Sequence, residues 1–271
     1  MRPGRLTTPN VAGLVLLAAL ALLALAAEWV APYDPAERTG APFEKPGPAH
    51  WLGTNDIGQD ILSEVIFGAR ISLQIGVLAA ALSVALGTTV GLLAGFFRGA
   101  LGVVLMRLVD MVLVIPFAPL MILLAAYLGQ SVWNLIVVIG LVTWARPARV
   151  IRAQVLTLTG QEFVLAARAL GAGPLRIIAT HIFPGIASLA MAQFVLAASS
   201  AILVEAGLSF LGLGDPTQKS WGTILFYAQA RNAFLSGAWV WWVLPPGLMI
   251  TASVLAFALV GHSPHPSAAR T

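Results

Sequence analysis

Long apolar stretches separated by short polar segments are the dominant pattern of this chain. A helix that crosses a bilayer needs about 20 mostly apolar residues. Six stretches reach that length, at residues 11–30, 71–96, 101–128, 132–150, 186–208 and 238–260. We therefore predict an all-α, polytopic membrane protein with six transmembrane helices. Pro116 should kink the third helix because proline has no backbone N–H to donate.

The first apolar stretch has two interpretations. Arg2 and Arg5 precede a run that ends in LALAA, as in a cleaved signal peptide. However, the run from residue 11 to 27 is longer than the usual signal core of about 7–15 residues. We expect it to be retained as a membrane anchor.

The composition supports a membrane protein. Of the 271 residues, 59% are hydrophobic and 10% are charged, against roughly 25% charged in soluble domains. The chain has no cysteine, which excludes a disulfide framework, an iron–sulfur cluster and a cysteine zinc site. The net charge of +4 fits arginines in cytoplasmic loops better than a surface that binds nucleic acid.

The distribution of Lys and Arg predicts the orientation. If the N-terminus is cytoplasmic, ten basic residues lie inside (Arg2, Arg5, Arg98, Arg107, Arg146, Arg149, Arg152, Arg168, Arg176 and Arg270) and five lie outside (Arg38, Lys45, Arg70, Lys219 and Arg231). The positive-inside rule favours this direction. Six spans then return the C-terminus to the cytoplasm, and segments 31–70 and 209–237 face outward. The tryptophans at 239, 241 and 242 are expected to form an interfacial aromatic belt.

A polar helical segment at residues 159–184 stands out from its apolar surroundings. Thr159 and Glu162 have the spacing of a capping box, which starts a helix. Gly171 supplies a stop, and Pro174 suits the first turn of a second short helix over residues 175–183. The sequence thus predicts a rigid helix–Gly–helix elbow on the cytosolic side, where a soluble partner can dock.

Five motifs in order resemble one known family. HWLGTNDIGQD, GARISL, RLVDMVLVIP, EFVLAARALGAGPLRIIATHIFPG and EAGLSFLGLG look like the dipeptide, oligopeptide and nickel permeases of ATP-binding-cassette importers. The similarity covers about residues 10–260, and within that family it is to the class with an extended external segment after the first span. The elbow is similar to the EAA loop of these permeases, with Ala166, Ala167, Gly171 and Pro184 at its fixed positions.

This resemblance implies the type I importer permease fold and a transport subunit rather than an enzyme. The implied partners are a second, similar permease, two cytosolic ATPases and an external solute-binding protein, with ATP and magnesium held by the ATPases and no cofactor in this chain. The elbow would be the coupling helix that contacts an ATPase. Its implied contact residues are Glu162, Ala166, Ala167, Ala169, Gly171, Ala172 and Pro174.

The chain departs from the family pattern at several positions. Leu165 stands where the loop usually has glutamate, so any polar contact that this glutamate makes with the ATPase in relatives is expected to be absent or to be taken over by Glu162. Asn55, Gln59 and Glu64 replace residues that are often acidic, basic and basic in relatives. The tail after Gly261, HSPHPSAART, lacks the usual charged segment and should be irregular.

Motifs for chemistry are absent from the sequence. Gln218 precedes the only Lys-Ser pair, Lys219-Ser220, where a phosphate-binding loop needs glycine. The four histidines do not form a metal-ligand set, and no Ser/His/Asp arrangement has a supporting motif. We predict no catalytic, cofactor or metal site.

Two acidic residues inside predicted spans are candidates for the transport pathway or for helix packing, because charge is costly in a bilayer. Asp110 follows Arg107 by three residues, so an ion pair on the helix surface is expected. Glu205 has no basic neighbour within four residues. It can either line the pathway or hydrogen-bond another helix or the partner permease.

The sequence therefore predicts a permease that moves di- or oligopeptides by alternating access, within the cell membrane. Nickel or another small solute is the alternative cargo, and an ATP-independent secondary transporter or a non-transporting membrane scaffold is an alternative class. The expected organisation is an anchor helix and external segment at 1–70, a permease core at 71–261 with the coupling loop at about 152–184, and a cytosolic tail at 262–271.

Overall fold

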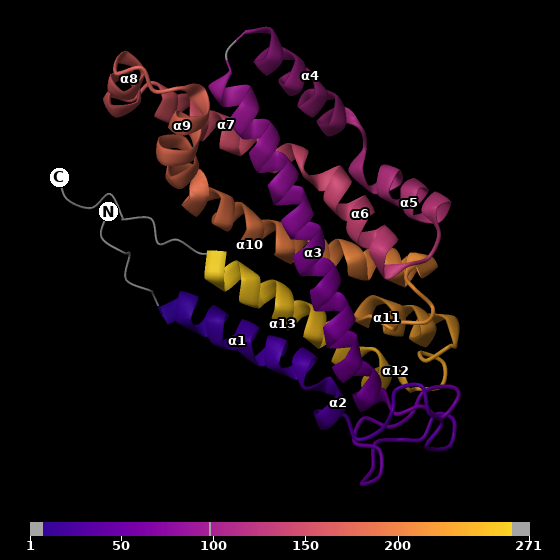
Figure 1. Ribbon diagram of the computed structural model, residues 1–271. Coiled ribbons are helices and arrows are strands. Elements are labelled where there is room, and N and C mark those ends of the chain that lie inside the picture. Colours follow the sequence, from indigo (N-terminus) through magenta and orange to yellow (C-terminus); the bar gives the residue numbers. More distant parts are fainter. Residues whose placement is uncertain (1–7, 98, 262–271) are drawn as a thin grey trace, which may run out of the picture. The chain divides into compact units, whose positions relative to one another are not determined.

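The computed structural model describes residues 8–97 and 99–261 and is helical over most of that length (Figure 1). The regular elements of these residues are all helices, accompanied by two isolated β-bridges, Arg38–Gln59 and Thr54–Asp60. The predictions made for Arg2, Arg5, Arg98, His262, His265, Arg270 and the tail 262–271 lie outside the described residues. The predicted all-α class is confirmed.

Four helices are long and apolar enough to cross a membrane. They cover Thr8–Leu25, Ile61–Phe96, Pro174–Leu213 and Trp239–Gly261. Two bent pairs qualify only when each pair is taken as one span: α4 (Ala100–Val114) with α5 (Phe117–Leu128), and α6 (Val132–Thr143) with α7 (Ala145–Thr159). The count is thus four to six, and the upper value equals the predicted number.

Pro116 has a larger effect than the predicted kink. It lies between α4 and α5, whose axes differ by 88°. Ile115 is extended (φ −68°, ψ 130°), because a residue before proline is driven out of the helical region. Proline and its predecessor therefore end one helix and begin another.

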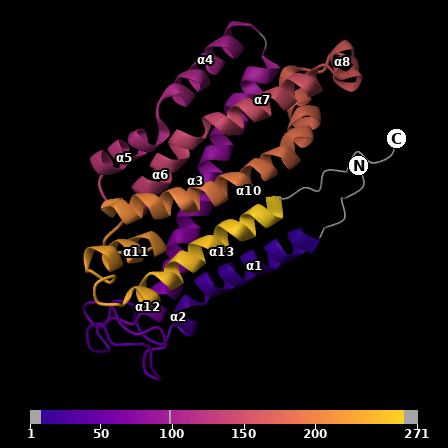
Figure 2. The ribbon, with the colours of Figure 1, turned by 180° about the vertical axis from the view of Figure 1, so that it is seen from behind.

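The first compact unit contains residues up to 75 and from 202 onward. It holds α1 (Thr8–Leu25), α2 (Ala27–Val30), the start of α3 (Ile61–Phe96), the π-helical turn η2 (Ser209–Leu213), α11 (Trp221–Ala230), α12 (Trp239–Trp242) and α13 (Leu244–Gly261). Helices α1 and α13 lie side by side in both views (Figures 1 and 2). They approach closely at Gly13, where a Cβ would lie 2.8 Å from the Ala256 carbonyl oxygen.

The second unit, residues 76–201, is organised around α3 and α7. Three glycines spaced four apart on α3, Gly87, Gly91 and Gly95, face α7. A Cβ on Gly91 would lie 2.5 Å from the Ala148 carbonyl oxygen. The two backbones therefore touch along this seam, as small residues allow in membrane helices.

Two predicted boundaries change. Helix α3 begins at Ile61 rather than near residue 71, so its first turns carry Glu64 and Arg70 and its polar start hides the helix from a hydropathy reading. Helix α7 continues to Thr159, beyond the predicted end at 150. The predicted division at residue 70 separates topological regions and stays a prediction.

The prediction of an interfacial aromatic belt is wrong for Trp242. This side chain is buried in the core of the first unit and packs edge-on against Phe43, with ring centroids 6.0 Å apart. Trp239, in contrast, is exposed. Local sequence shows three tryptophans in four positions but not which face of the helix meets the core.

Candidate functional site

The elbow begins differently from the predicted capping box. Thr159 is the last residue of α7, is buried, and donates its hydroxyl hydrogen to the Leu156 carbonyl. Helix α8 (Glu162–Ala169) has Gln161 at its N-cap, with no capping bond from a side chain. The prediction failed because the preceding helix extends as far as Thr159, which keeps its hydroxyl within its own helix.

The end of α8 agrees with the predicted glycine stop. Gly171 has φ +80°, a conformation that is costly for residues with a Cβ. Its N–H bonds to the Arg168 carbonyl, and the N–H of Ala172 bonds to the Ala167 carbonyl, both at 3.0 Å. This is the pair of bonds of a Schellman motif, which fixes the direction in which the chain leaves α8.

The two faces of the elbow have different environments. Val164 is fully buried in an apolar cluster with Ile177 and Ile182, and Ala167 and Ala172 pack against that cluster. The other predicted coupling positions (Glu162, Ala166, Ala169, Gly171 and Pro174) are exposed. The predicted contact set thus splits into residues that hold the elbow together and residues that are available to a partner.

Large apolar side chains add to the exposed face of the elbow. Leu165 is 51% exposed, Leu170 89% and Leu175 79%. Within the described residues, these three side chains are therefore left open to solvent or to a partner. From the sequence, Leu165 was interpreted only as a missing glutamate, and Leu170 and Leu175 were not singled out, although leucines in a polar loop are a visible signal.

The second limb of the elbow is continuous with a membrane helix. Pro174 begins α9 (Pro174–Ile177), which passes through the π-helical turn η1 (Ile178–Ile182) into α10 (Phe183–Leu208). The predicted separate helix over 175–183 is therefore wrong. The wide turn bonds Phe183 N–H to the Ile178 carbonyl, and the next residue, Pro184, has no N–H that the helix must satisfy.

Contacts with α3 and η1 hold the elbow. The Arg168 guanidinium lies 5.5 Å from the ring centroid of Phe96, near the end of α3, in a cation–π arrangement. Phe163 stacks on His181 of η1 with ring centroids 5.9 Å apart. A force on α8 therefore reaches both α3 and the helix that begins at Pro174.

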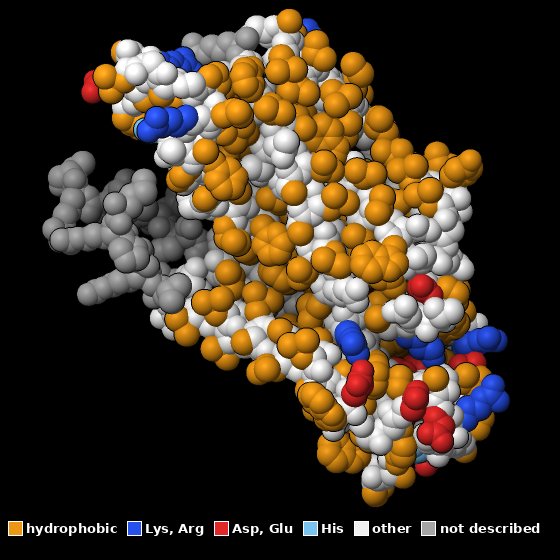
Figure 3. All heavy atoms as spheres, in the orientation of Figure 1, with side chains coloured by type: hydrophobic (Ala, Val, Ile, Leu, Met, Phe, Trp, Pro, Cys, Tyr) orange, Lys and Arg blue, Asp and Glu red, His pale blue; other side chains and the backbone are white. Residues whose placement is uncertain are grey.

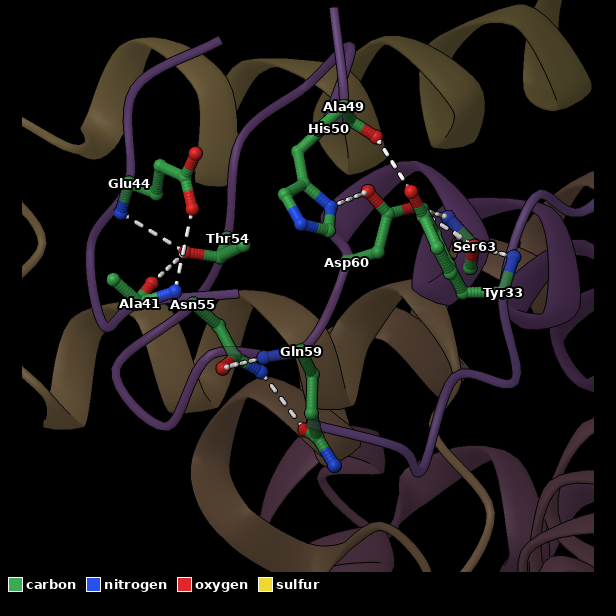
Figure 4. Close-up of polar contacts among 10 residues, drawn as sticks. All are labelled: Tyr33, Ala41, Glu44, Ala49, His50, Thr54, Asn55, Gln59, Asp60 and Ser63. Carbon is green, nitrogen blue, oxygen red and sulfur yellow. Dashed lines mark hydrogen bonds and ion pairs between the residues drawn. The ribbon is translucent and has the colours of Figure 1, made fainter. Parts of the chain in front are cut away.

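In the first unit, polar contacts order the segment between α2 and α3 (Figure 4), and many of the charged side chains on the face drawn in Figure 3 gather there. Asp60 accepts hydrogen bonds from the Ser63 N–H and hydroxyl, both 2.8 Å, and so caps α3. Its other oxygen lies 2.9 Å from His50 Nδ1. His50 and Asp60 are both buried, so this pair fixes the segment to the helix start.

A second polar cluster joins this segment to the loop before α11. Lys219 Nζ donates to Glu64 and, at 2.6 Å, to Gln59 Oε1. Asn55 Nδ2 donates to Gln59 Oε1 and Glu64 Oε1, each at 2.9 Å. The three residues that depart from the family pattern thus join one hydrogen-bonded cluster, in which Lys219 balances the charge of the buried Glu64 carboxylate. Sequence reasoning missed Lys219 as their partner because 155 positions separate it from Glu64.

Glu205 lies among hydroxyl groups. Its side chain is fully buried and accepts hydrogen bonds from Ser209 Oγ at 2.7 Å and from Ser72 Oγ of α3 at 3.3 Å. Ser72 also accepts from the N–H of Trp221, the first residue of α11. Glu205 therefore links α10, α3 and η2 inside the first unit.

Asp110 pairs with a different arginine from the predicted one. Arg149 Nη2 of α7 lies 2.6 Å from Asp110 Oδ1 of α4. The expected pair with Arg107 on the same helix is wrong, because the bend between α6 and α7 presents a basic side chain to α4. No group of three or more metal-ligating side chains occurs in residues 8–97 and 99–261.

Comparison with known proteins identifies the class. The model of the family described as "Binding-protein-dependent transport system inner membrane component" matches residues 87–263. A second one, "N-terminal TM domain of oligopeptide transport permease C", matches residues 9–46. The chain belongs to the family of inner-membrane components of binding-protein-dependent transport systems.

Curated relatives cover nearly the whole chain. "Di/tripeptide transport system permease protein DppC" of Pseudomonas aeruginosa (strain UCBPP-PA14) is 40% identical over 92% of this chain and 84% of its own length. "Dipeptide transport system permease protein DppC" of Haemophilus influenzae is 37% identical over 92% and 86%. A putative peptide transport system permease protein of Brucella suis is 39% identical over 92% and 83%.

Membership of this family confirms several predictions. The chain is a multi-pass inner-membrane protein and a permease, which is a transport subunit and not an enzyme. A binding-protein-dependent system also includes an ATPase and a solute-binding protein. The roles assigned to individual coupling residues stay predictions.

Proposed function

We propose that this chain is one of two permeases of an ATP-driven importer for di- and oligopeptides. The observation that supports this cargo is the similarity, along 92% of the chain, to relatives whose names are those of di/tripeptide and dipeptide permeases. In the proposed complex an external binding protein delivers the peptide. Two cytosolic ATPases, which hold ATP and magnesium, drive the change between outward-open and inward-open states.

The elbow of α8 and α9 is the proposed contact with one ATPase. Its exposed face offers Leu165, Leu170 and Leu175 to an apolar groove, with Glu162, Ala166 and Ala169 beside them. Because the Schellman motif fixes the exit from α8 and α9 continues into α10, displacement of the elbow moves a membrane helix and is not lost in a flexible joint. The proposed orientation has both termini and the elbow in the cytoplasm.

Reconstituted transport tests the proposal. The complete system is placed in proteoliposomes, and uptake of labelled dialanine and of nickel is measured with and without ATP. We expect dialanine uptake that requires ATP and the binding protein. Uptake of nickel but not of dialanine would show that the cargo is nickel rather than a peptide. Uptake without ATP would show that the protein is an ATP-independent transporter.

A further inference from the structure

A recess of about 510 Å³ opens on the first unit, within the size range of small-molecule sites. It lies between the start of α3 and the loop that precedes α11. The residues that line it and carry its chemistry are Gln59, Glu64, Phe67, Arg70, Gln74 and Lys219. None of the comparisons assigns a role to this recess.

The part of α3 that lines the recess extends beyond what a bilayer requires. With 36 residues the helix is about 54 Å long at about 1.5 Å per residue, against a hydrocarbon core of about 30 Å. Its polar first turns carry Glu64 and Arg70 and therefore project from one side. In the proposed orientation that side is external, where the binding protein releases the solute.

The charges of the recess favour an anionic group. Glu64 is 1% exposed and its charge is balanced by Lys219. Arg70 donates one hydrogen bond, from Nη1 to Glu28 Oε1 at 2.9 Å, and its side chain is 54% exposed. A guanidinium has five N–H donors in a planar fork, so one edge of Arg70 is open to a second carboxylate. Glu28, which is itself exposed, does not line the recess and forms only a weak pair in water.

The other walls suit the rest of a short peptide. Phe67, Ile71 and Gln74 follow one another along a single face of α3. Phe67 and Ile71 give an apolar surface for a side chain. The Gln74 amide can donate to a peptide carbonyl and accept from a peptide N–H.

We propose that this recess is an external contact site for the peptide in transit, with Arg70 binding the C-terminal carboxylate. The inference rests on the proposed peptide cargo and adds the site and the recognised end of the molecule. A carboxylate on the binding protein would satisfy the same guanidinium. The recess favours the small solute because it combines apolar walls with a few amide and charged groups, as small-molecule sites do.

The test combines two permease variants with two solutes, as in a double-mutant cycle. Uptake of dialanine and of dialanine amide is measured with the complete complex, for the native permease and for Arg70→Gln, with the same binding protein throughout. Since the binding protein is constant, its own preference cancels between permeases. We expect the preference for the free acid over the amide to fall by about tenfold in Arg70→Gln, the size of a charge-assisted hydrogen bond.

Three control variants sharpen the test. Arg231→Gln removes another exposed arginine, which pairs with Asp56 and does not line the recess, and should keep the native preference. Glu28→Gln frees Arg70 from its ion pair and should keep or increase the preference for the free acid. Arg70→Lys keeps the charge without the fork and should retain part of it, which also guards against misfolding of Arg70→Gln.

The outcomes separate the possible explanations. An unchanged preference in Arg70→Gln overturns the carboxylate site while peptide transport stands. An equal loss for acid and amide, with weaker stimulation of ATP hydrolysis by the binding protein, assigns Arg70 to docking and also overturns it. Failure of the native complex to import either peptide overturns the proposed cargo and this inference with it.

Discussion

Arg149 Nη2 lies 2.6 Å from Asp110 Oδ1, so an ion pair joins α7 to α4 inside the second unit. Both side chains are about half exposed in the isolated chain. In water such a pair contributes little. Beside lipid, however, each charge needs the other, because an unpaired charge costs up to about 2.5–3.5 kcal/mol at the bilayer centre.

We therefore predict that Arg149→Leu lowers the stability of the complex by about 1–3 kcal/mol, and that adding Asp110→Leu restores most of it. The single change leaves a carboxylate without its partner, whereas the double change removes both charges. The measurement is the thermal unfolding of the purified complex, monitored by size-exclusion chromatography after heating to a series of temperatures. Arg107→Leu is the control and should have little effect; a larger loss for Arg107→Leu than for Arg149→Leu would contradict the observed pairing.

The glycine seam between α3 and α7 gives a second prediction. Gly91→Ala should destabilise the permease by about 1–3 kcal/mol, the usual cost of overpacking, because the new Cβ would lie 2.5 Å from the Ala148 carbonyl oxygen. Gly207→Ala is the matched control, since a Cβ there has open space around it. Equal melting temperatures for the two variants would show that α7 can withdraw from α3 at no cost.

Apolar length and spacing were enough to predict the helical class and the approximate spans. The same information could not locate the start of α3, because Asp60, Ser63 and Glu64 make its first turn polar while Asp60 caps it. Nor could it foresee that Pro116 would turn the chain by 88°. A proline shows where a helix is interrupted, but neighbouring helices decide the angle.

The candidate site shows a similar division between local and distant information. Gly171 and Pro174 act through their own backbone, and their positions at a helix stop and a helix start followed from sequence alone. The partners of Glu64 and Asp110 lie 155 and 39 positions away. Such pairs depend on how helices pack, which one sequence without its fold does not specify.

Gly171 should be sensitive to substitution by proline. Its φ of +80° is closed to proline, whose ring holds φ near −65°, so Gly171→Pro must change the exit from α8. We expect normal membrane insertion but loss of uptake and of peptide-stimulated ATP hydrolysis in the reconstituted complex. Gly173→Ala, at φ −69° with open space around it, should retain both activities. Normal uptake by Gly171→Pro would remove the elbow from the mechanism.

The hydroxyl groups around Glu205 make its neutral analogues informative. Glu205→Gln keeps an oxygen that can accept from Ser72 or Ser209, whereas Glu205→Leu leaves both buried hydroxyls without this acceptor. Each lost acceptor costs about 1–3 kcal/mol, so Glu205→Leu should unfold at a clearly lower temperature than Glu205→Gln. Stability and uptake together separate helix packing from a pathway role: a variant that folds normally but loses uptake would place Glu205 in the pathway.

The pair of Glu64 and Lys219 allows the sharpest test of the external cluster. Lys219→Met leaves a buried carboxylate without its counter-charge, which typically costs about 3–5 kcal/mol, and should reduce the amount of assembled complex. Adding Glu64→Gln removes the charge and should recover most of that loss, because Asn55 Nδ2 can still donate to an amide oxygen at this position. The exchanged pair, Glu64→Lys with Lys219→Glu, should also give more assembled complex than either of its single changes. If the double variants are no more stable than Lys219→Met, the two side chains act independently, and the loop before α11 is held to α3 by apolar contacts such as those of Trp221 with the buried cluster that includes Ile61 and Val65.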